Sequence, residues 1–216
     1  MDERALIFDF DGTVLDTEMP VYRGWADLYA EHGVELDLAW WKSIIGTNDE
    51  PDLFAKLEIE LGRSIDPSWR DWRRARRDEL LHAEAIRPGV LDWLDAADEL
   101  DIPVGIASSS PIDWVERHLD RLGLLERFAC FACCNEVIPA KPDPTSYRLA
   151  CEALDADPVR SIAVEDSPHG IAAATGAGLF TVAVPHGLTS DLDLSRADLV
   201  VASLADVSLA EVLARR

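Results

Sequence analysis

The chain has 216 residues, of which 48% are hydrophobic and 28% are charged, so it can bury the core of one α/β domain with a modest insertion. Its 20 basic and 41 acidic side chains give a formal net charge of −21, which disfavours nucleic acid and anionic membrane surfaces as partners. No apolar run approaches the roughly 18 residues that span a bilayer, and acidic residues crowd the first eleven positions. We therefore expect a cytoplasmic protein without a signal peptide.

Six short apolar runs occur along the chain, and a helical pattern follows each of them. We expect the strands at residues 5–8, 104–107, 129–134, 162–164, 180–184 and 199–201. Outside residues 17–86, we expect the helices at 88–100, 111–122, 144–154, 168–177 and 206–214. Continuous apolar runs are typical of strands buried on both faces, and their alternation with helices predicts an α/β fold with a doubly wound parallel sheet.

Residues 17–86 interrupt this alternation, because they show only helical patterns with breaks near Gly33, 46–48 and 62–67. We predict a helical cap domain of three to five helices at 17–86, inserted into a core domain formed by residues 1–16 and 87–216. Since the insertion follows the first strand, it should lie over the carboxyl edge of the sheet, where ligands bind. Hinges of such a lid are expected near 16–18 and 86–88.

Two carboxylates follow the first predicted strand. Asp9 ends that run, Asp11 stands two residues later, and Gly12 permits a tight turn. An aspartate at a strand end can act as a nucleophile, and a carboxylate two residues on can transfer protons. An ordinary turn after a strand is the alternative, since Asp-Gly satisfies it equally well.

Hydroxyl groups and a lysine follow the next two predicted strands. Ser108, Ser109 and Ser110 precede a helical pattern, where hydroxyls and N–H groups suit an anion; a serine that caps the helix is the alternative. Lys141 stands next to two prolines and is one of only three lysines among the 20 basic residues. A compact ammonium between two anions would explain its presence, and an ordinary surface lysine is the alternative.

The fourth predicted strand ends in two adjacent carboxylates, Glu165 and Asp166. Such a pair is costly unless a cation neutralises it, and Mg²⁺ fits because it takes oxygen ligands and shares carboxylates with a phosphate. The alternative is that Asp166 or Ser167 only caps the next helix. Because the carboxyl ends of parallel strands converge at one edge, the four motifs together predict a phosphoryl-transfer site.

With these motifs in this order, the chain resembles the haloacid dehalogenase (HAD) superfamily, in the β-phosphoglucomutase-like and phosphatase branch with a helical cap. The matching segments are 9–17, Ser108, 141–142 and 164–167. The resemblance implies a Rossmann-like core, Mg²⁺ as cofactor and a phosphoaspartate intermediate. It assigns Asp9 as nucleophile and metal ligand, Asp11 as general acid/base with its backbone carbonyl on the metal, Gly12, Ser108, Ser109 and Lys141 to the substrate, and Glu165 and Asp166 to the metal.

The resulting prediction is a phosphomonoester hydrolase for a small phosphorylated metabolite, acting as a monomer or homodimer. A phosphosugar mutase is the first alternative. Members similar to β-phosphoglucomutase carry a cap histidine and a cap arginine, whereas this chain has Val21 and either Asn48 or Asp49 there. A phosphonoacetaldehyde hydrolase would need a cap lysine, and neither Lys42 nor Lys56 has the expected context. A binding or regulatory protein that keeps only the fold is the last alternative, and the complete motif set argues against it.

Two groups of residues in the insertion have simpler interpretations. We expect Trp25, Trp40 and Trp41 to pack between the cap helices. Five arginines lie on one predicted helix between residues 70 and 77. We expect them to form a solvated face, paired to Asp71, Asp78 and Glu79.

Cysteines and histidines are interpreted as structural. Cys130 and Cys133 have the spacing of a zinc pair, but residues i and i+3 of a strand face opposite sides, so we expect buried thiols. His169 lies beside the metal motif and is interpreted as a loop residue. His186 has no partner at motif spacing.

Overall fold

The computed structural model describes residues 3–44 and 51–215, and its centre is a six-stranded sheet in which every pairing is parallel. The strands are β1 (Leu6–Phe8), β2 (Val104–Ser108), β3 (Cys130–Cys133), β4 (Ile162–Glu165), β5 (Phe180–Ala183) and β6 (Leu199–Val200). Their order is β3-β2-β1-β4-β5-β6, so the direction of winding reverses between β1 and β4. This confirms the doubly wound parallel sheet, and the crevice at the reversal is where such folds bind ligands.

Helices cover both faces of the sheet, because successive side chains of β1 point to opposite faces and both sets are apolar. Leu6 and Phe8 point into one hydrophobic cluster, whereas Ile7 between them points into another. The first cluster is closed by α5 (Val90–Glu99), α6 (Ile112–Leu122) and α9 (Leu209–Leu213), and the second by α7 (Thr145–Ala153) and α8 (Pro168–Ala177). Three 3₁₀ turns complete this part, at Leu125–Arg127, Pro158–Arg160 and Leu204–Asp206.

The last helix is shorter than the sequence predicts. The pattern indicated residues 206–214, but α9 begins only at Leu209. Ser208 accepts a hydrogen bond from the Glu211 N–H, and the Glu211 side chain accepts one from the Ser208 N–H. This reciprocal capping box fixes the start of the helix, and the residues before it stay outside.

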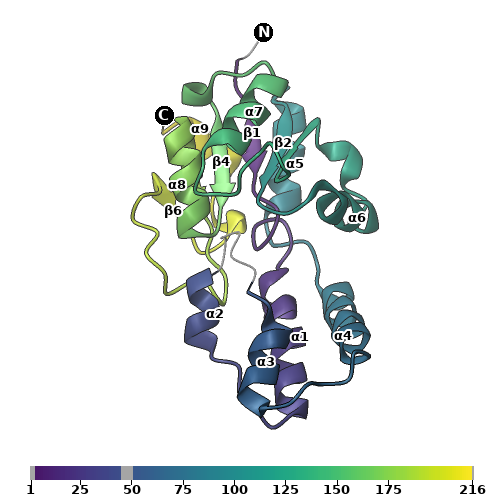
Figure 1. Cartoon of the computed structure of the whole chain (residues 1–216). Coiled ribbons are helices and arrows are strands. Elements are labelled where there is room, and N and C mark those ends of the chain that lie inside the picture. Colours follow the sequence, from purple (N-terminus) through teal and green to yellow (C-terminus); the bar gives the residue numbers. More distant parts are fainter. Residues whose placement is uncertain (1–2, 45–50, 216) are drawn as a thin grey trace.

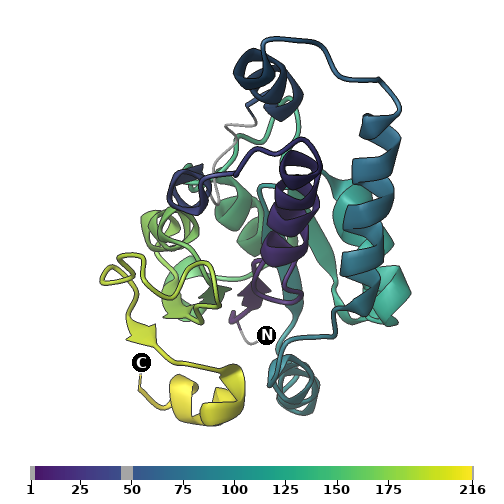
Figure 2. The same ribbon diagram turned by 90° about the horizontal axis from the view of Figure 1, so that it is seen from below.

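The insertion after β1 is helical, as predicted. Its described residues form α1 (Glu18–Glu31), α2 (Leu38–Ile44), α3 (Leu53–Leu61) and α4 (Trp69–Ala83). These helices lie below the sheet, on the side toward which β4 points, and α1 packs along α4 (Figures 1 and 2). They enclose a further hydrophobic cluster around Leu28, Tyr29 and Leu57, to which Leu188 of the loop after β5 also contributes. All three predicted tryptophans pack in it. The boundaries of a cap domain stay a prediction.

The two segments that connect the insertion to the sheet lie side by side. Leu15 and Ile86 form an antiparallel bridge, and the N–H of Arg87 donates to the carbonyl of Val14 over 3.0 Å. The Arg87 guanidinium also donates to the carbonyl of Gly12 and, over 3.0 Å, to those of Val184 and Pro185. Both connections are therefore tied to the loop after β5, and hinge motion there stays a prediction.

The arginine-rich face of α4 is only partly as predicted. The expected pairs are confirmed for Arg74 with Asp71, Arg76 with Glu79 and Arg77 with Asp78. Arg70 and Arg73, in contrast, lie 4.2 Å over the rings of Phe54 and Trp25. A weakly hydrated guanidinium stacks on aromatic faces, so these arginines help to close the cluster. No helix in the described part of the chain has the length and apolarity of a membrane span.

Candidate active site

Three buried carboxylates meet where β1 and β4 end. Asp9 follows β1 directly, and its N–H donates to the Val164 carbonyl of β4 over 2.9 Å. Glu165 is the last residue of β4 and Asp166 follows it. One oxygen from each carboxylate lies within 4.8 Å of the others, and the three residues are 5%, 0% and 2% exposed. The sequence prediction that these side chains converge is confirmed.

Lys141 neutralises part of this cluster. Its ammonium bonds to Asp9 Oδ1 and, over 2.6 Å, to Glu165 Oε1, and the residue is only 4% exposed. Burial lowers the pKa of Lys141, but the two carboxylates more than offset this and raise it. Burial raises the pKa of Asp9 well above its ordinary value, and Lys141 opposes that rise. The alternative of an ordinary surface lysine is wrong.

Glu165 is saturated with donors. Its Oε1 accepts from Lys141 and, over 2.7 Å, from the hydroxyl of Tyr147, while Oε2 accepts from the Asp166 N–H over 3.2 Å. A Cβ at Gly170 would overlap this carboxylate, so glycine leaves the room that it occupies. Glu165 is therefore held rigidly toward α7 and α8, with Lys141 as its cationic partner.

Asp166 is the least satisfied member of the cluster. Its Oδ2 is buried and has no hydrogen-bond partner among the described residues, although His186 Nε2 lies 2.9 Å away. Gly12 has a φ of +80°, and a Cβ there would clash with both atoms. Gly12 thus permits the turn and the close approach of Asp166 and His186. Its own N–H donates to Leu15 over 2.8 Å.

One histidine interpretation needs correction, and another gains a neighbour that the sequence did not show. His186 has no partner at motif spacing, but its Nε2 lies 2.9 Å from Asp166 Oδ2 in space, because β5 pairs with β4 and the loop after β5 returns to the same edge. No spacing pattern links two residues that meet only through strand pairing. His169 is not a loop residue, since it lies in the first turn of α8.

Asp11 points into a different set of groups. Oδ1 accepts from Thr17 Oγ1 over 2.6 Å and from Trp114 Nε1 over 2.8 Å. Oδ2 accepts from Ser110 Oγ over 2.6 Å and from Ser108 Oγ over 3.5 Å. Four donors therefore hold this carboxylate, and its side chain lies outside the acidic trio. The sequence prediction included Ser108 and did not assign roles to Ser110, Thr17 or Trp114.

The helix-cap alternatives have different outcomes. The residue that precedes α6 is Pro111, and no side chain caps that helix, so the serines after β2 are not helix caps. Ser109 instead accepts the N–H of Lys141 over 3.1 Å. Ser167 does cap α8, through the N–H of Gly170, whereas Asp166 does not.

Glu18 faces the acidic edge from the insertion. It is the first residue of α1 and is half-buried. Burial, together with Asp11, Asp166 and Asp16, raises its pKa to about 8. A carboxyl group in this position keeps its proton to a higher pH than an exposed glutamate does. Sequence reasoning missed it, because only the fold brings the start of α1 beside the ends of β1 and β4.

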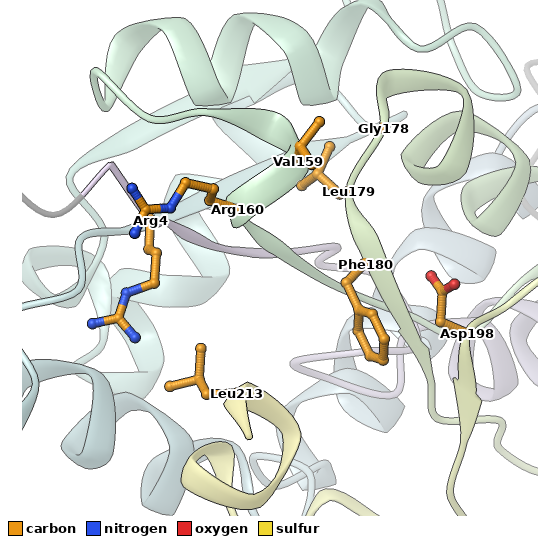
Figure 3. A pocket seen from close by; sticks show the side chains of 8 residues that line it. All are labelled: Arg4, Val159, Arg160, Gly178, Leu179, Phe180, Asp198 and Leu213. Atoms are coloured by element: carbon orange, nitrogen blue, oxygen red, sulfur yellow. The ribbon is translucent and has the colours of Figure 1, made fainter. Parts of the chain in front are cut away.

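A separate cavity of about 550 Å³ lies at the opposite, amino edge of the sheet. Figure 3 shows the side chains of Arg4 and Arg160 near each other at one end and that of Asp198 at the other. Arg160 pairs with Glu3 over 3.1 Å, and Asp198 accepts the N–H of Thr181 over 2.8 Å. The charges of Arg160 and Asp198 are therefore engaged within the chain, and the cavity is remote from the acidic trio.

Comparison with known proteins agrees with this geometry. A family model described as haloacid dehalogenase-like hydrolase matches residues 3–178. The chain is 37% identical over 211 residues to YhcW of Bacillus subtilis (strain 168), which is named as a phosphatase, and 97% of this chain and 96% of YhcW are covered.

Two further relatives match over nearly their whole length. Validoxylamine A 7'-phosphate phosphatase of Streptomyces hygroscopicus subsp. limoneus is 30% identical over 207 residues, which are 94% of this chain and 95% of that protein. The crystal structure of CbbY from Rhodobacter sphaeroides in complex with phosphate aligns with a TM-score of 0.78 and 28% identity, covering 98% and 99% of the two chains. The chain therefore belongs to the haloacid dehalogenase-like hydrolases and is an enzyme of their phosphatase branch.

Proposed function

We propose that the chain is a Mg²⁺-dependent phosphomonoester hydrolase that acts on a small phosphorylated metabolite through a phosphoaspartate intermediate. The observation that carries this proposal is the buried Lys141 ammonium bonded to Asp9, beside the carboxylates of Glu165 and Asp166. A nucleophile, a cation and oxygen ligands for a metal thus share one edge of the sheet. We place the activity in the cytoplasm, on the grounds of composition given above.

The donor set fits magnesium. Carboxylate oxygens are its preferred ligands, and Asp166 Oδ2 is a buried acceptor that the described residues leave unsatisfied. Asp9 and Asp166 would hold the ion, with the backbone carbonyl of Asp11 that the family resemblance implies. Glu165 would support them mainly by fixing Lys141, since its oxygens already have donors. When bound, magnesium supplies positive charge that offsets the carboxylates and the phosphate.

Asp9 is the nucleophile of the proposed first step. A carboxylate oxygen of Asp9 attacks phosphorus, and the bond from phosphorus to the ester oxygen breaks. Lys141 steadies Asp9 and neutralises the charge that develops on the phosphoryl group. Asp11 gives its proton to the departing oxygen, so that an alcohol leaves and an acyl phosphate stays on Asp9.

Asp11 acts as a base in the proposed second step. It takes a proton from water, and the resulting hydroxide attacks phosphorus of the acyl phosphate. Inorganic phosphate leaves, Asp9 is regenerated as a carboxylate, and Asp11 is again protonated. Ser108 and Ser109 lie at the end of β2 on the same edge, where their hydroxyls would hold the phosphate oxygens.

The insertion favours a hydrolase over the two rival enzymes. Val21 packs in the hydrophobic cluster of the insertion and offers no ligand to a second phosphate, whereas positions 48 and 49 lie outside the described residues. Lys42 pairs with Asp191 over 2.6 Å, and Lys56 lies 3.5 Å over the ring of Trp40. Both lysines are thus engaged away from the acidic trio.

The proposal is tested by release of inorganic phosphate from a panel of phosphate esters, with Mg²⁺ or with excess chelator. Polyol and sugar phosphates come first, because two relatives from Escherichia coli are named hexitol phosphatase and fructose-1-phosphate phosphatase. Asp9→Asn should lower turnover by at least about 10³-fold. The matched control is Asp155→Asn, an exposed position with positive φ that asparagine tolerates.

Four outcomes would count against the proposal. Turnover that persists in excess chelator contradicts the metal assignment. Full activity of Asp9→Asn contradicts the nucleophile, as does a phosphorylated peptide that does not contain Asp9 after acid quenching. Activity that appears only with added glucose 1,6-bisphosphate and a sugar phosphate would support the mutase instead.

A further inference from the structure

The four donors around Asp11 differ in one chemical property. Thr17, Ser108 and Ser110 donate through hydroxyl groups, which can rotate and accept a hydrogen bond instead. Trp114 donates through its indole N–H over 2.8 Å, and an indole nitrogen only donates. When Asp11 carries a proton, the hydroxyls can adapt to it, but Trp114 cannot.

This difference distinguishes the two oxygens of Asp11. Oδ1 receives the indole N–H and the Thr17 hydroxyl, whereas Oδ2 receives only serine hydroxyls. We infer that Trp114 is a positioning residue that keeps Oδ1 of Asp11 as an acceptor and thereby assigns the acid proton to Oδ2. Oδ2 faces Ser110 and Ser108, on the loop to which we assign the phosphate. This inference rests on the proposed function, because it requires Asp11 to act as the general acid.

The indole itself is held from several sides. His118 lies edge-on to it with ring centroids 4.4 Å apart, and His118 stacks on Phe10, the residue between Asp9 and Asp11. The guanidinium of Arg77, from α4 of the insertion, lies 5.2 Å from the ring, as does that of Arg117. The direction of the indole N–H is therefore fixed by the core and by the insertion together.

The inference predicts an effect that depends on the leaving group. An alkyl phosphate needs a proton on its departing oxygen, whereas an activated aryl phosphate such as p-nitrophenyl phosphate releases a stable phenolate without one. Trp114→Phe keeps an aromatic ring at this position and removes the N–H together with the five-membered ring of the indole. We expect kcat for an alkyl phosphate to fall about 10- to 100-fold, with KM within about threefold, because general acid catalysis contributes on this scale. The pre-steady-state burst of nitrophenolate should stay within about threefold.

The burst is also the internal control for folding. A Trp114→Phe protein with a distorted site would lose the burst and the alkyl phosphate activity together, and that result would overturn the inference. Unchanged kcat for the alkyl phosphate would overturn it as well. Asp120→Asn is the matched control: it changes an exposed residue of the same helix, α6, and should leave both measurements unchanged.

Asp11→Asn separates this inference from the proposed function. It should abolish alkyl phosphate turnover and keep the nitrophenolate burst. A wild-type enzyme that hydrolyses no phosphate ester, or an Asp11→Asn enzyme with full alkyl phosphate activity, contradicts the proposed function itself. If Asp11→Asn behaves as expected while Trp114→Phe resembles the wild type, only the role of Trp114 is wrong.

Discussion

The carboxyl edge of the sheet contains a buried lysine–carboxylate cluster, whereas Lys42 of the helical insertion forms a pair with Asp191, which lies in the loop after β5. At the edge, the side chains of Lys141, Asp9 and Glu165 are at most 8% exposed. On the insertion, Lys42 reaches Asp191 over the same 2.6 Å, yet the Asp191 side chain is 64% exposed. Equal geometry therefore does not mean equal energy, since desolvation makes buried charges depend on their partner, whereas solvent screens the exposed pair.

The largest effect is expected from Lys141→Met. The substitution leaves Asp9 and Glu165 buried without their cation, so the free energy of unfolding in chelator should fall by about 3 to 5 kcal/mol. Activity should fall by about 10²- to 10³-fold, because a charge that stabilises the transition state is lost. Urea denaturation and phosphate release measure the two effects.

Added Mg²⁺ sharpens this test. A cation bound by Asp9 and Asp166 replaces part of the missing charge, so it should stabilise the Lys141→Met protein more than the wild type. Equal stabilisation of the two proteins would contradict the proposed metal site.

A smaller effect is expected at His118, which is buried beside the edge without a carboxylate partner. Burial, with Arg117 and Arg121, lowers its pKa to about 4, and neither ring nitrogen has a hydrogen-bond partner among the described residues. The unfolded chain regains a pKa near 6.5, so it binds a proton between pH 6.5 and 4 that the folded chain does not. Stability is therefore lost as the pH falls through this window.

The measurement compares His118→Phe with the wild type by urea denaturation at pH 7 and pH 4. The free energy of unfolding of the wild type should decrease by about 2 to 3 kcal/mol more than that of the variant. The carboxylates contribute equally to both proteins and cancel. The exposed His82→Gln variant serves as control and should follow the wild type. Parallel pH curves for His118→Phe would show that His118 takes up its proton in the folded state.

The smallest effect is expected from Lys42→Met, which repeats the Lys141 substitution in the exposed pair. Its free energy of unfolding should change by less than about 1 kcal/mol, and 0.5 M salt should reduce that change further. Urea denaturation at low and high salt measures both. A loss of stability as large as that of Lys141→Met would contradict the claim that the exposed pair contributes less than the buried one.

Much of the core was predictable, because each motif reports a local requirement. Strands buried on both faces need continuous apolar runs, and the polar residue that ends a run marks the carboxyl edge. Asp9, Lys141 and Glu165 were therefore found one by one. The insertion has no such rule. Arg70 is exposed and Arg73 is half-buried, but amphipathic spacing did not show that both also lie over aromatic rings, those of Phe54 and Trp25.

Residues that assist the motifs were not predictable in the same way. Thr17 stands where a threonine ordinarily caps a helix, yet its hydroxyl donates to Asp11 and makes no cap bond. Trp114 has the pattern of a core residue of α6, and its indole N–H reaches a carboxylate 103 positions earlier. Local propensity describes Thr17 and Trp114 separately, and it does not predict that both donate hydrogen bonds to Asp11.

By itself, the sequence determined which chemical groups end the strands, since burial and turn formation act on neighbours in the chain. Only the tertiary structure decided which of these groups meet and how well each is solvated. The strand order places β5 beside β4 and so brings His186 close to Asp166, while the start of α6 after β2 places Trp114 at the same edge as Asp11. Those contacts depend on the packing of the whole sheet. The strength of their hydrogen bonds and the cost of their desolvation are set by the folded environment.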